Sequence, residues 1–216
     1  MKKFSIFLPI IMLSLFLYMC SATNSSKQSV QTKTPAELAE FSKAYFASGC
    51  FWCVEAVFES VKGVEEAISG YAGGKELNPT YQQVGAGKTG HTEAVEVYYD
   101  PSVIDYKTLL EVYYGSHDPT TVNGQHPDYG RQYRSAIFYQ TKEEKKLIES
   151  FIANLNASKE YDKPIATEVV PFEKFWQAED YHQNYEKLNP NQPYVRSVSI
   201  PRLKRFQAKF PDLLKE

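Results

Sequence analysis

Two spacings of apolar residues recur along the chain and predict two kinds of element. Residues 93–99 alternate apolar and polar side chains with a period of two, which predicts a half-buried strand. After Gly49, apolar residues recur at the helical spacing i, i+3, i+4 and i+7, namely Val54, Val57, Phe58 and Val61. This stretch therefore predicts a helix with one apolar face that begins near Cys50 and ends before Gly63.

The same patterns predict the remaining elements. Further strands are expected at residues 44–48, 64–71, 134–140 and 165–170, and further helices at residues 106–115, after Thr141, and at 173–188. Thr141 and Glu144 form a capping box ahead of a helix whose inward face is Leu147, Ile148, Phe151, Ile152 and Leu155. Asn189-Pro190 is expected to end the helix at 173–188.

The carboxyl-terminal segment, residues 201–216, is amphipathic. Its apolar residues Leu203, Phe206 and Phe210 are spaced to dock on the domain, and its Lys and Arg residues are expected to face solvent. The order of elements predicts one two-layer α+β domain with a mixed sheet and helices packed on it. Two loops, residues 72–92 and 115–133, exceed the usual limit of about 12–15 residues and are therefore expected to build the functional site.

The first 22 residues have the pattern of an export signal. Lys2 and Lys3 precede an apolar run over residues 4–19, which small residues follow. The run contains Pro9 and is short for a membrane span of about 20 residues. We therefore expect an exported protein of the periplasm or cell envelope rather than one with a spanning anchor.

Two interpretations of the signal's end stay open. The signal is either cleaved after Ala22, or Cys20 becomes the lipid-bearing first residue of a lipoprotein and attaches the protein to a membrane. Residues 23–36, rich in Ser, Thr, Gln and Lys, are expected to form a flexible linker, and residues 37–216 the folded domain.

Composition narrows the class of protein. Apolar residues make up 43% of the chain and charged residues 23%, which is typical of a globular domain rather than a disordered one. The 24 Lys and Arg residues are outnumbered by 26 Asp and Glu residues. Because a nucleic-acid-binding domain normally carries a basic excess, we expect no nucleic-acid partner.

Two cysteines, Cys50 and Cys53, flank the start of the first predicted helix. The positive end of a helix favours a thiolate, so the pKa of Cys50 is expected to be lowered. From the spacing alone the pair fits a structural disulfide, a zinc site or a redox-active pair. The short loop makes a structural disulfide weakly stabilising, and the zinc interpretation lacks paired ligands because the histidines are scattered at His91, His117, His126 and His182.

Glu93 adds an acid to this chemistry. Period two places Glu93 on the same strand face as Val95, Val97 and Tyr99. A carboxyl on an apolar face loses hydration, which raises its pKa and lets it hold a proton near neutral pH. The alternative is that Glu93, at the end of the strand, turns into solvent. A protonated acid beside a thiolate is the pairing needed to remove an oxygen atom from a substrate.

These residues lie in sequence blocks that resemble the A-type peptide methionine sulfoxide reductases. The blocks keep the family's order: Gly49–Ala56 (GCFWCVEA), Ser69–Gly74, Asn78–Tyr81, Thr89–Val95, His117–Thr121, Asp128–Ser135 and Ala178–Gln183. The resemblance covers residues 44–190, most of the predicted domain, and the expected fold is a ferredoxin-like plait.

The resemblance implies a reaction and a role for each site residue. Methionine-S-sulfoxide, protein-bound or free, would be reduced to methionine in the repair of oxidative damage, without a bound cofactor and with an external thioredoxin-like reductant. Cys50 would attack the sulfoxide sulfur, and Glu93 would protonate the oxygen. The supporting residues would be Phe51 and Trp52 as an apolar wall, Tyr81 and Tyr133 as hydroxyl donors, and Asp128 and His182 as groups that orient or support the substrate site.

The chain departs from the family pattern at two places. Many relatives carry a recycling cysteine after Asn-Gln-Pro-Tyr, but here Val195 follows Tyr194, and Cys53 stands where many relatives have glycine. The resemblance therefore implies that Cys53 forms the redox disulfide with Cys50, which the reductant then opens. The second departure is His126-Pro127, directly before Asp128. We expect the enzyme to act as a monomer.

Two other functions fit part of the pattern. A general thiol–disulfide oxidoreductase would need the cysteine pair but not the buried acid or the tyrosines. A zinc- or peptide-binding module would use the aromatic pocket without turnover. Consumption of methyl sulfoxides by the reduced protein, together with its metal content, separates these hypotheses from the reductase.

Overall fold

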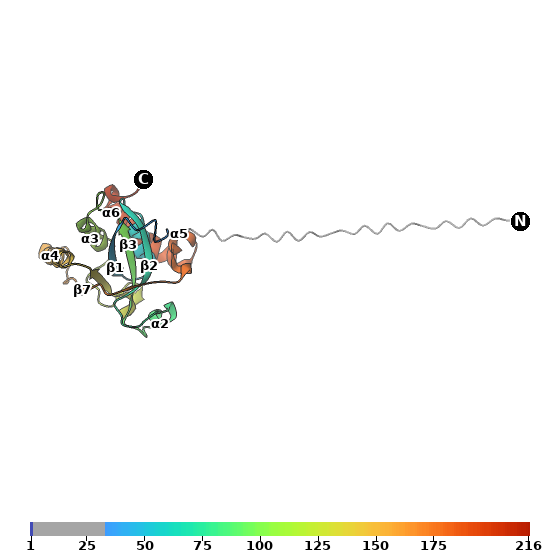
Figure 1. Cartoon of the computed structure of the whole chain (residues 1–216), viewed down its shortest axis with the longest axis horizontal. Coiled ribbons are helices and arrows are strands. Elements are labelled where there is room, and N and C mark those ends of the chain that lie inside the picture. The colour runs from blue at the N-terminus through green and yellow to red at the C-terminus, as the bar shows by residue number, and fades with distance from the viewer. Residues whose placement is uncertain (2–32) are drawn as a thin grey trace.

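The computed structural model describes residue 1 and residues 33–216 (Figure 1). The export signal and most of the linker predicted from the sequence therefore lie outside the described residues. In the described part of the chain, no helix has both the length and the apolar character that crossing a membrane requires.

A six-stranded sheet forms the centre of the domain. Its strands are β1 (Ser42–Ser48), β2 (Val64–Ala72), β3 (Thr92–Tyr99), β6 (Ser135–Tyr139), β7 (Glu168–Pro171) and β8 (Phe175–Gln177), in the order β7-β6-β1-β3-β2-β8. All neighbouring pairs are antiparallel except β6 and β7, so the sheet is mixed, as predicted. The central order β6-β1-β3-β2, with helices after β1 and β3, is that of a ferredoxin-like plait.

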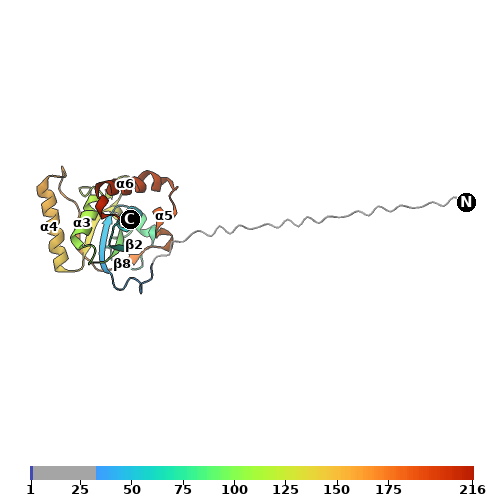
Figure 2. The same cartoon turned by 90° about the horizontal axis from the view of Figure 1, so that it is seen from above.

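The helices cover one face of this sheet. They are α1 (Phe51–Glu59), α3 (Tyr106–Gly115), α4 (Lys142–Ser158) and α6 (Ile200–Lys209), and α3 and α4 lie side by side in Figure 2. Their apolar faces meet strand residues such as Phe46 and Val97 in one buried core. Because burial of apolar surface contributes about 25 cal/mol per Å², this layer of helices supplies much of the stability of the domain.

The two long loops contain short elements of their own. Helix α2 (Tyr81–Gly85) lies in the first loop, and the hairpin of β4 (Gly124–Gln125) and β5 (Asp128–Tyr129) lies in the second. A 3-10 turn, Arg131–Tyr133, follows the hairpin. The peptide bond between His126 and Pro127 is cis.

The capping box before α4 differs from the predicted one in one hydrogen bond. The Thr141 hydroxyl accepts the Glu144 N–H at 3.1 Å, as predicted, but the Glu144 carboxylate accepts the Gln140 N–H at 2.6 Å instead of that of Thr141. The predicted strand over residues 165–170 is shorter and begins later, at Glu168.

The predicted helix over residues 173–188 is wrong. Residues 175–177 form β8, which pairs with Gly70–Ala72 at the edge of β2, and Tyr185–Leu188 form only the short helix α5. The Gln183 side chain continues the edge contact by bonding the backbone N–H and carbonyl of Ser69, each at 3.0 Å. Pairing with a free strand edge therefore outweighs the helical pattern here.

The carboxyl-terminal segment docks through α6, as predicted, but one of its cations is buried. Phe206 lies in the core beside α1 and α3. Arg202, expected on the solvent face, is only 7% exposed and bonds the carbonyls of Ser48 and Ser116, both at 2.8 Å. The reason is that both carbonyls lie at the ends of their elements, β1 and α3, where the Arg202 guanidinium supplies a donor to each.

Candidate active site

A tight turn between β1 and α1 positions Cys50. Gly49 has a φ of +82°, a conformation that favours glycine, and a Cβ there would lie 2.7 Å from the Cβ of Gln125. Cys50 is the N-cap residue of α1, and Cys53 lies one turn further along the helix. The prediction that a turn at Gly49-Cys50 starts the helix is confirmed.

The Cys50 and Cys53 thiols are free, buried and in hydrogen-bonding contact. Burial raises the pKa of Cys50 well above its usual range, and contact with Cys53 and the charge of Glu93 act in the same direction. The expected lowering by the helix start is therefore outweighed in the reduced protein. The hydrogen bond from Cys50 lowers the pKa of Cys53 to about 7, with further help from the positive charge of Arg202.

Glu93 lies on the apolar face of β3, where the alternation placed it. Its side chain is 1% exposed, and its carboxyl accepts the Phe51 N–H at 3.0 Å. Burial raises the pKa of Glu93 to about 8, more than the Phe51 hydrogen bond lowers it. The carboxyl therefore holds a proton at neutral pH, and the alternative of a solvent-exposed Glu93 is excluded.

Cys50 and Glu93 share a small cavity with a volume of about 190 Å³. Its lining comes from α1, β3, both long loops and the segment before α6: Cys50, Phe51, Trp52, Tyr81, Glu93, Asp128, Tyr133, Gln192 and Tyr194. Burial raises the pKa of Tyr81 to about 12, and that of Tyr133 also lies above its usual range, so both phenols keep their protons. The cavity thus joins a thiol, a protonated acid, two hydroxyl donors and an aromatic wall.

His182 lies behind this wall and does not line the cavity. Its Nδ1 accepts the Trp52 indole N–H at 3.1 Å, and its ring packs against Phe51 with centroids 4.9 Å apart. Burial lowers the pKa of His182 to about 4, so the imidazole is neutral and able to accept that bond. The Tyr185 ring stacks on Trp52 with a centroid distance of 3.7 Å. His182 therefore positions the indole and does not contact the cavity.

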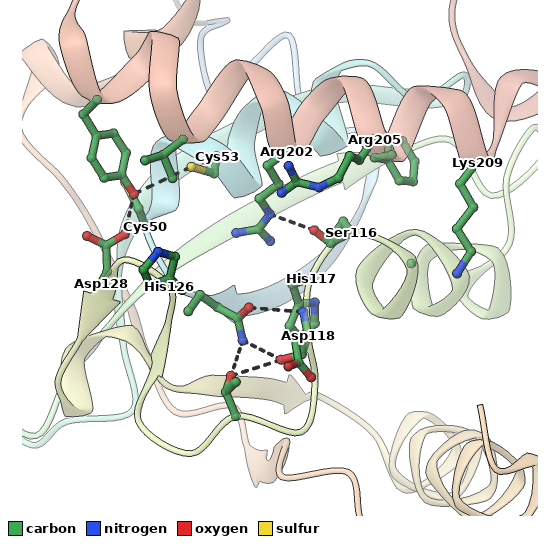
Figure 3. A pocket seen from close by; sticks show the side chains of 16 residues that line it. Cys50, Cys53, Ser116, His117, Asp118, His126, Asp128, Arg202, Arg205 and Lys209 are labelled. Carbon is green, nitrogen blue, oxygen red and sulfur yellow. Dashed lines mark hydrogen bonds between the residues drawn. The ribbon is translucent and has the colours of Figure 1, made fainter. Parts of the chain in front are cut away.

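The cysteine pair also borders a second, larger cavity of about 400 Å³ (Figure 3). Cys53 lines this cavity but not the smaller one, whereas Cys50, Asp128 and Tyr194 line both. Arg202, Arg205 and Lys209 of α6 also line this cavity. Cys50 thus lies at the boundary between the two cavities, and Cys53 lies on the side of the larger one.

Sequence reasoning missed two residues beside Cys53. The Tyr194 hydroxyl lies 3.9 Å from the Cys53 sulfur and donates a hydrogen bond to Asp128, and Arg202 approaches from α6. The sequence signal for Tyr194 is its place in the Asn-Gln-Pro-Tyr segment. Among residues 33–216, no group of three or more His, Cys, Asp or Glu residues is arranged to hold a metal ion.

Comparison with known proteins connects this geometry to a family. A model of the family described as peptide methionine sulfoxide reductase matches residues 42–214. The chain is 47% identical to peptide methionine sulfoxide reductase MsrA 2 of Synechocystis sp. over 174 residues, which cover 80% of this chain and 81% of that protein. It is 48% identical to the MsrA protein of Sulfolobus acidocaldarius, covering 78% and 95% of the two chains.

A solved structure agrees with these relatives. The crystal structure of Mxr1 from Saccharomyces cerevisiae in reduced form superposes with a TM-score of 0.65 at 32% identity, covering 71% of this chain and 88% of that one. The chain therefore belongs to the peptide methionine sulfoxide reductase family of the A type, and is a peptide-methionine (S)-S-oxide reductase.

Proposed function

We propose that Cys50 and Glu93 carry out thiol-dependent reduction of methionine-S-sulfoxide in the smaller cavity. The observation that carries the proposal is the buried Glu93 carboxyl, with its pKa raised to about 8, in the same small cavity as the Cys50 thiol. Phe51 and Trp52 hold the S-methyl group, and their asymmetric wall accounts for selection of one sulfoxide epimer.

The first step transfers the oxygen. Cys50 attacks the sulfoxide sulfur while Glu93 protonates the oxygen, with Tyr81 and Tyr133 donating hydrogen bonds to it. The attack forms a bond between the Cys50 sulfur and the substrate sulfur. The protonated oxygen then passes to the Cys50 sulfur as this S–S bond and the substrate S–O bond break, which leaves the thioether of methionine and a Cys50 sulfenic acid. The proton that Cys50 loses restores the Glu93 acid, so atoms and protons balance.

The second step recycles Cys50. The Cys53 sulfur attacks the sulfenic sulfur, forms the disulfide and releases the hydroxyl as water. A thioredoxin-like dithiol then reduces the Cys50–Cys53 disulfide and is itself oxidised. Support for Cys53 in this role comes from its contact with Cys50 and its lowered pKa. Val195, rather than a cysteine, follows Asn191-Gln192-Pro193-Tyr194, and Cys53 is the only thiol besides Cys50 after residue 20.

Replacing Cys53 with serine tests this scheme. The Cys53→Ser variant is expected to form one equivalent of methionine per protein and then stop, because the sulfenic acid has no thiol partner. Methionine yield with and without a thioredoxin system measures this. Ala56→Ser on the same helix is the matched control and should turn over normally. Multiple turnover of Cys53→Ser with thioredoxin would show that Cys53 does not recycle Cys50.

We also propose that the mature protein acts in the periplasm or cell envelope, as a monomer, on protein-bound or free methionine sulfoxide. The support for the location is the basic and apolar pattern of residues 2–22. Mass spectrometry of the mature amino terminus distinguishes lipidated Cys20 from cleavage after Ala22. An unprocessed chain would overturn the export proposal.

A further inference from the structure

We propose that Tyr194, oriented by Asp128, accepts the proton of Cys53 when Cys53 attacks the Cys50 sulfenic acid. Asp128 then serves the recycling step as a positioning residue, in addition to its place beside the substrate. This role rests on the proposed function, because it requires Cys53 to close the disulfide.

The hydroxyl of Tyr194 bridges the two groups concerned. It lies 3.9 Å from the Cys53 sulfur, within range of a sulfur hydrogen bond, and it donates a hydrogen bond to Oδ2 of Asp128. The dashed bonds from Cys53 and Asp128 in Figure 3 meet at this one hydroxyl. A hydroxyl that donates to a carboxylate leaves its lone pairs free to accept from a thiol.

The polypeptide holds this hydroxyl in place. The Tyr194 ring is half-buried and meets Trp52 edge-on, with centroids 6.0 Å apart. Tyr194 directly precedes a π-helical turn, Val195–Ser199, which leads into α6. Such turns are frequent at functional sites because they shift the side chains of one turn relative to the rest of a helix.

The need for a proton acceptor arises when Cys50 is oxidised. In the reduced protein the hydrogen bond from Cys50 is the largest cause of the lowered pKa of Cys53. Conversion of Cys50 to a sulfenic acid removes that thiol proton, so Cys53 needs another group to become a thiolate. Asp128 suits this task, since burial raises its pKa above that of an ordinary aspartate.

The proton path balances. The Cys53 thiol proton passes to the Tyr194 oxygen as the Tyr194 proton passes to Asp128. The Cys53 sulfur then bonds to the Cys50 sulfur, the S–O bond breaks, and the hydroxide takes the proton that Asp128 has received and leaves as water, so Asp128 returns to the carboxylate. Besides Cys53, Tyr194 and Asp128 themselves, the titratable and charged groups around this path are Cys50, Glu93, Tyr81, Tyr133, His126 and Arg202.

Step-resolved kinetics of Tyr194→Phe test the inference, because this change removes the hydroxyl and keeps the ring against Trp52. Reduced protein is mixed with methyl sulfoxide in the absence of reductant. Methionine formation reports the first step, and dimedone trapping of Cys50 together with loss of free thiols reports the second. The second step is expected to slow by roughly 10²-fold, the lower end of general-base effects, with sulfenic acid accumulating.

A pH profile and a control separate this role from packing. In Tyr194→Phe and Asp128→Asn, disulfide formation should increase with hydroxide concentration over a range where the wild-type rate is level. Tyr185→Phe, whose ring also packs on Trp52 but lines neither cavity, should keep the wild-type rate and profile.

Each failure points to a different cause. If Tyr194→Phe forms the disulfide at the wild-type rate, or if Tyr185→Phe slows it equally, the role of Tyr194 is overturned while the recycling by Cys53 stands. Loss of the first step in Tyr194→Phe also overturns it, because the hydroxyl would then act on the sulfoxide. If the wild-type thiols survive methionine formation, the recycling scheme itself fails, and this role fails with it.

Discussion

Burial determines the chemistry of Glu93. An ordinary glutamate is ionised at neutral pH. The Glu93 side chain, however, is 1% exposed and lies on the same apolar face of β3 as Val95 and Val97. The Phe51 N–H partly stabilises its charged form, yet desolvation dominates and the pKa rises to about 8. An acid of this strength can donate a proton at neutral pH and recover it afterwards.

Replacing Glu93 with glutamine tests this at the residue scale. The amide oxygen can still accept the Phe51 N–H, so the main loss is the acidic proton. Single-turnover methionine formation is expected to fall by about 10²–10⁴-fold. In the wild-type protein the rate should decrease as the pH rises through about 8, where Glu93 loses its proton, and Glu93→Gln should lack this decrease.

Glu96→Gln is the control for that experiment. Glu96 alternates to the other face of β3, where its carboxylate accepts bonds from Lys43, Tyr45 and Tyr98. Its replacement should leave methionine formation and the pH profile unchanged. A wild-type rate in Glu93→Gln would contradict the role of Glu93 as the acid.

At the scale of elements, the turn between β1 and α1 carries Cys50, the proposed nucleophile. Gly49 takes a left-handed φ, and its missing side chain leaves room for Gln125 of β4. Gly49→Ala is expected to destabilise the fold by about 2 kcal/mol or more and to displace Cys50. Urea denaturation and single-turnover kinetics measure the two effects.

Gly85 provides the comparison. It ends α2, and a Cβ there meets nothing nearer than 3.9 Å, so Gly85→Ala should change stability little. Equal stability of Gly49→Ala and the wild-type protein would mean that the close approach of Gln125 to Gly49 does not constrain the turn between β1 and α1.

Element prediction succeeded where the pattern was long and local, as in α1, α3 and α4. It failed at residues 173–188, where Phe175 and Trp176 fit a helix face as well as a strand. Pairing of this segment with Tyr71 and Ala72 decides for the strand. A short apolar run does not specify which strand it will pair with. The free edge of β2 therefore decides whether this segment forms a strand or a helix.

At the scale of the whole molecule, α6 supports the cysteine turn from the far end of the chain. Arg202 bonds Ser48 across 154 residues of sequence and also bonds the end of α3 at Ser116. Its positive charge lowers the pKa of Cys53, after the larger effect of the Cys50 hydrogen bond. One side chain thus ties three elements together behind the site.

Arg202→Met is expected to cost about 2–4 kcal/mol of stability, because it leaves the buried Ser48 and Ser116 carbonyls without donors. It should also raise the pKa of Cys53, measured as the pH dependence of thiol alkylation in the folded protein. Arg205→Met, at an exposed position of the same helix, is the control and should leave the stability of the protein nearly unchanged. No loss of stability in Arg202→Met would show that water satisfies these carbonyls.

The sequence by itself placed Cys50 at the start of a helix and Glu93 on an apolar strand face, and it determined the layers of the fold. The apolar face containing Glu93, the helix starting at Cys50 and the ordered motif blocks all depend on neighbours within a few residues, which periodicity records. Only the tertiary structure placed Tyr194 and Arg202 beside Cys53, and His182 behind Trp52. These contacts join segments 130 to 154 residues apart, and no local pattern specifies which distant side chain completes a buried site.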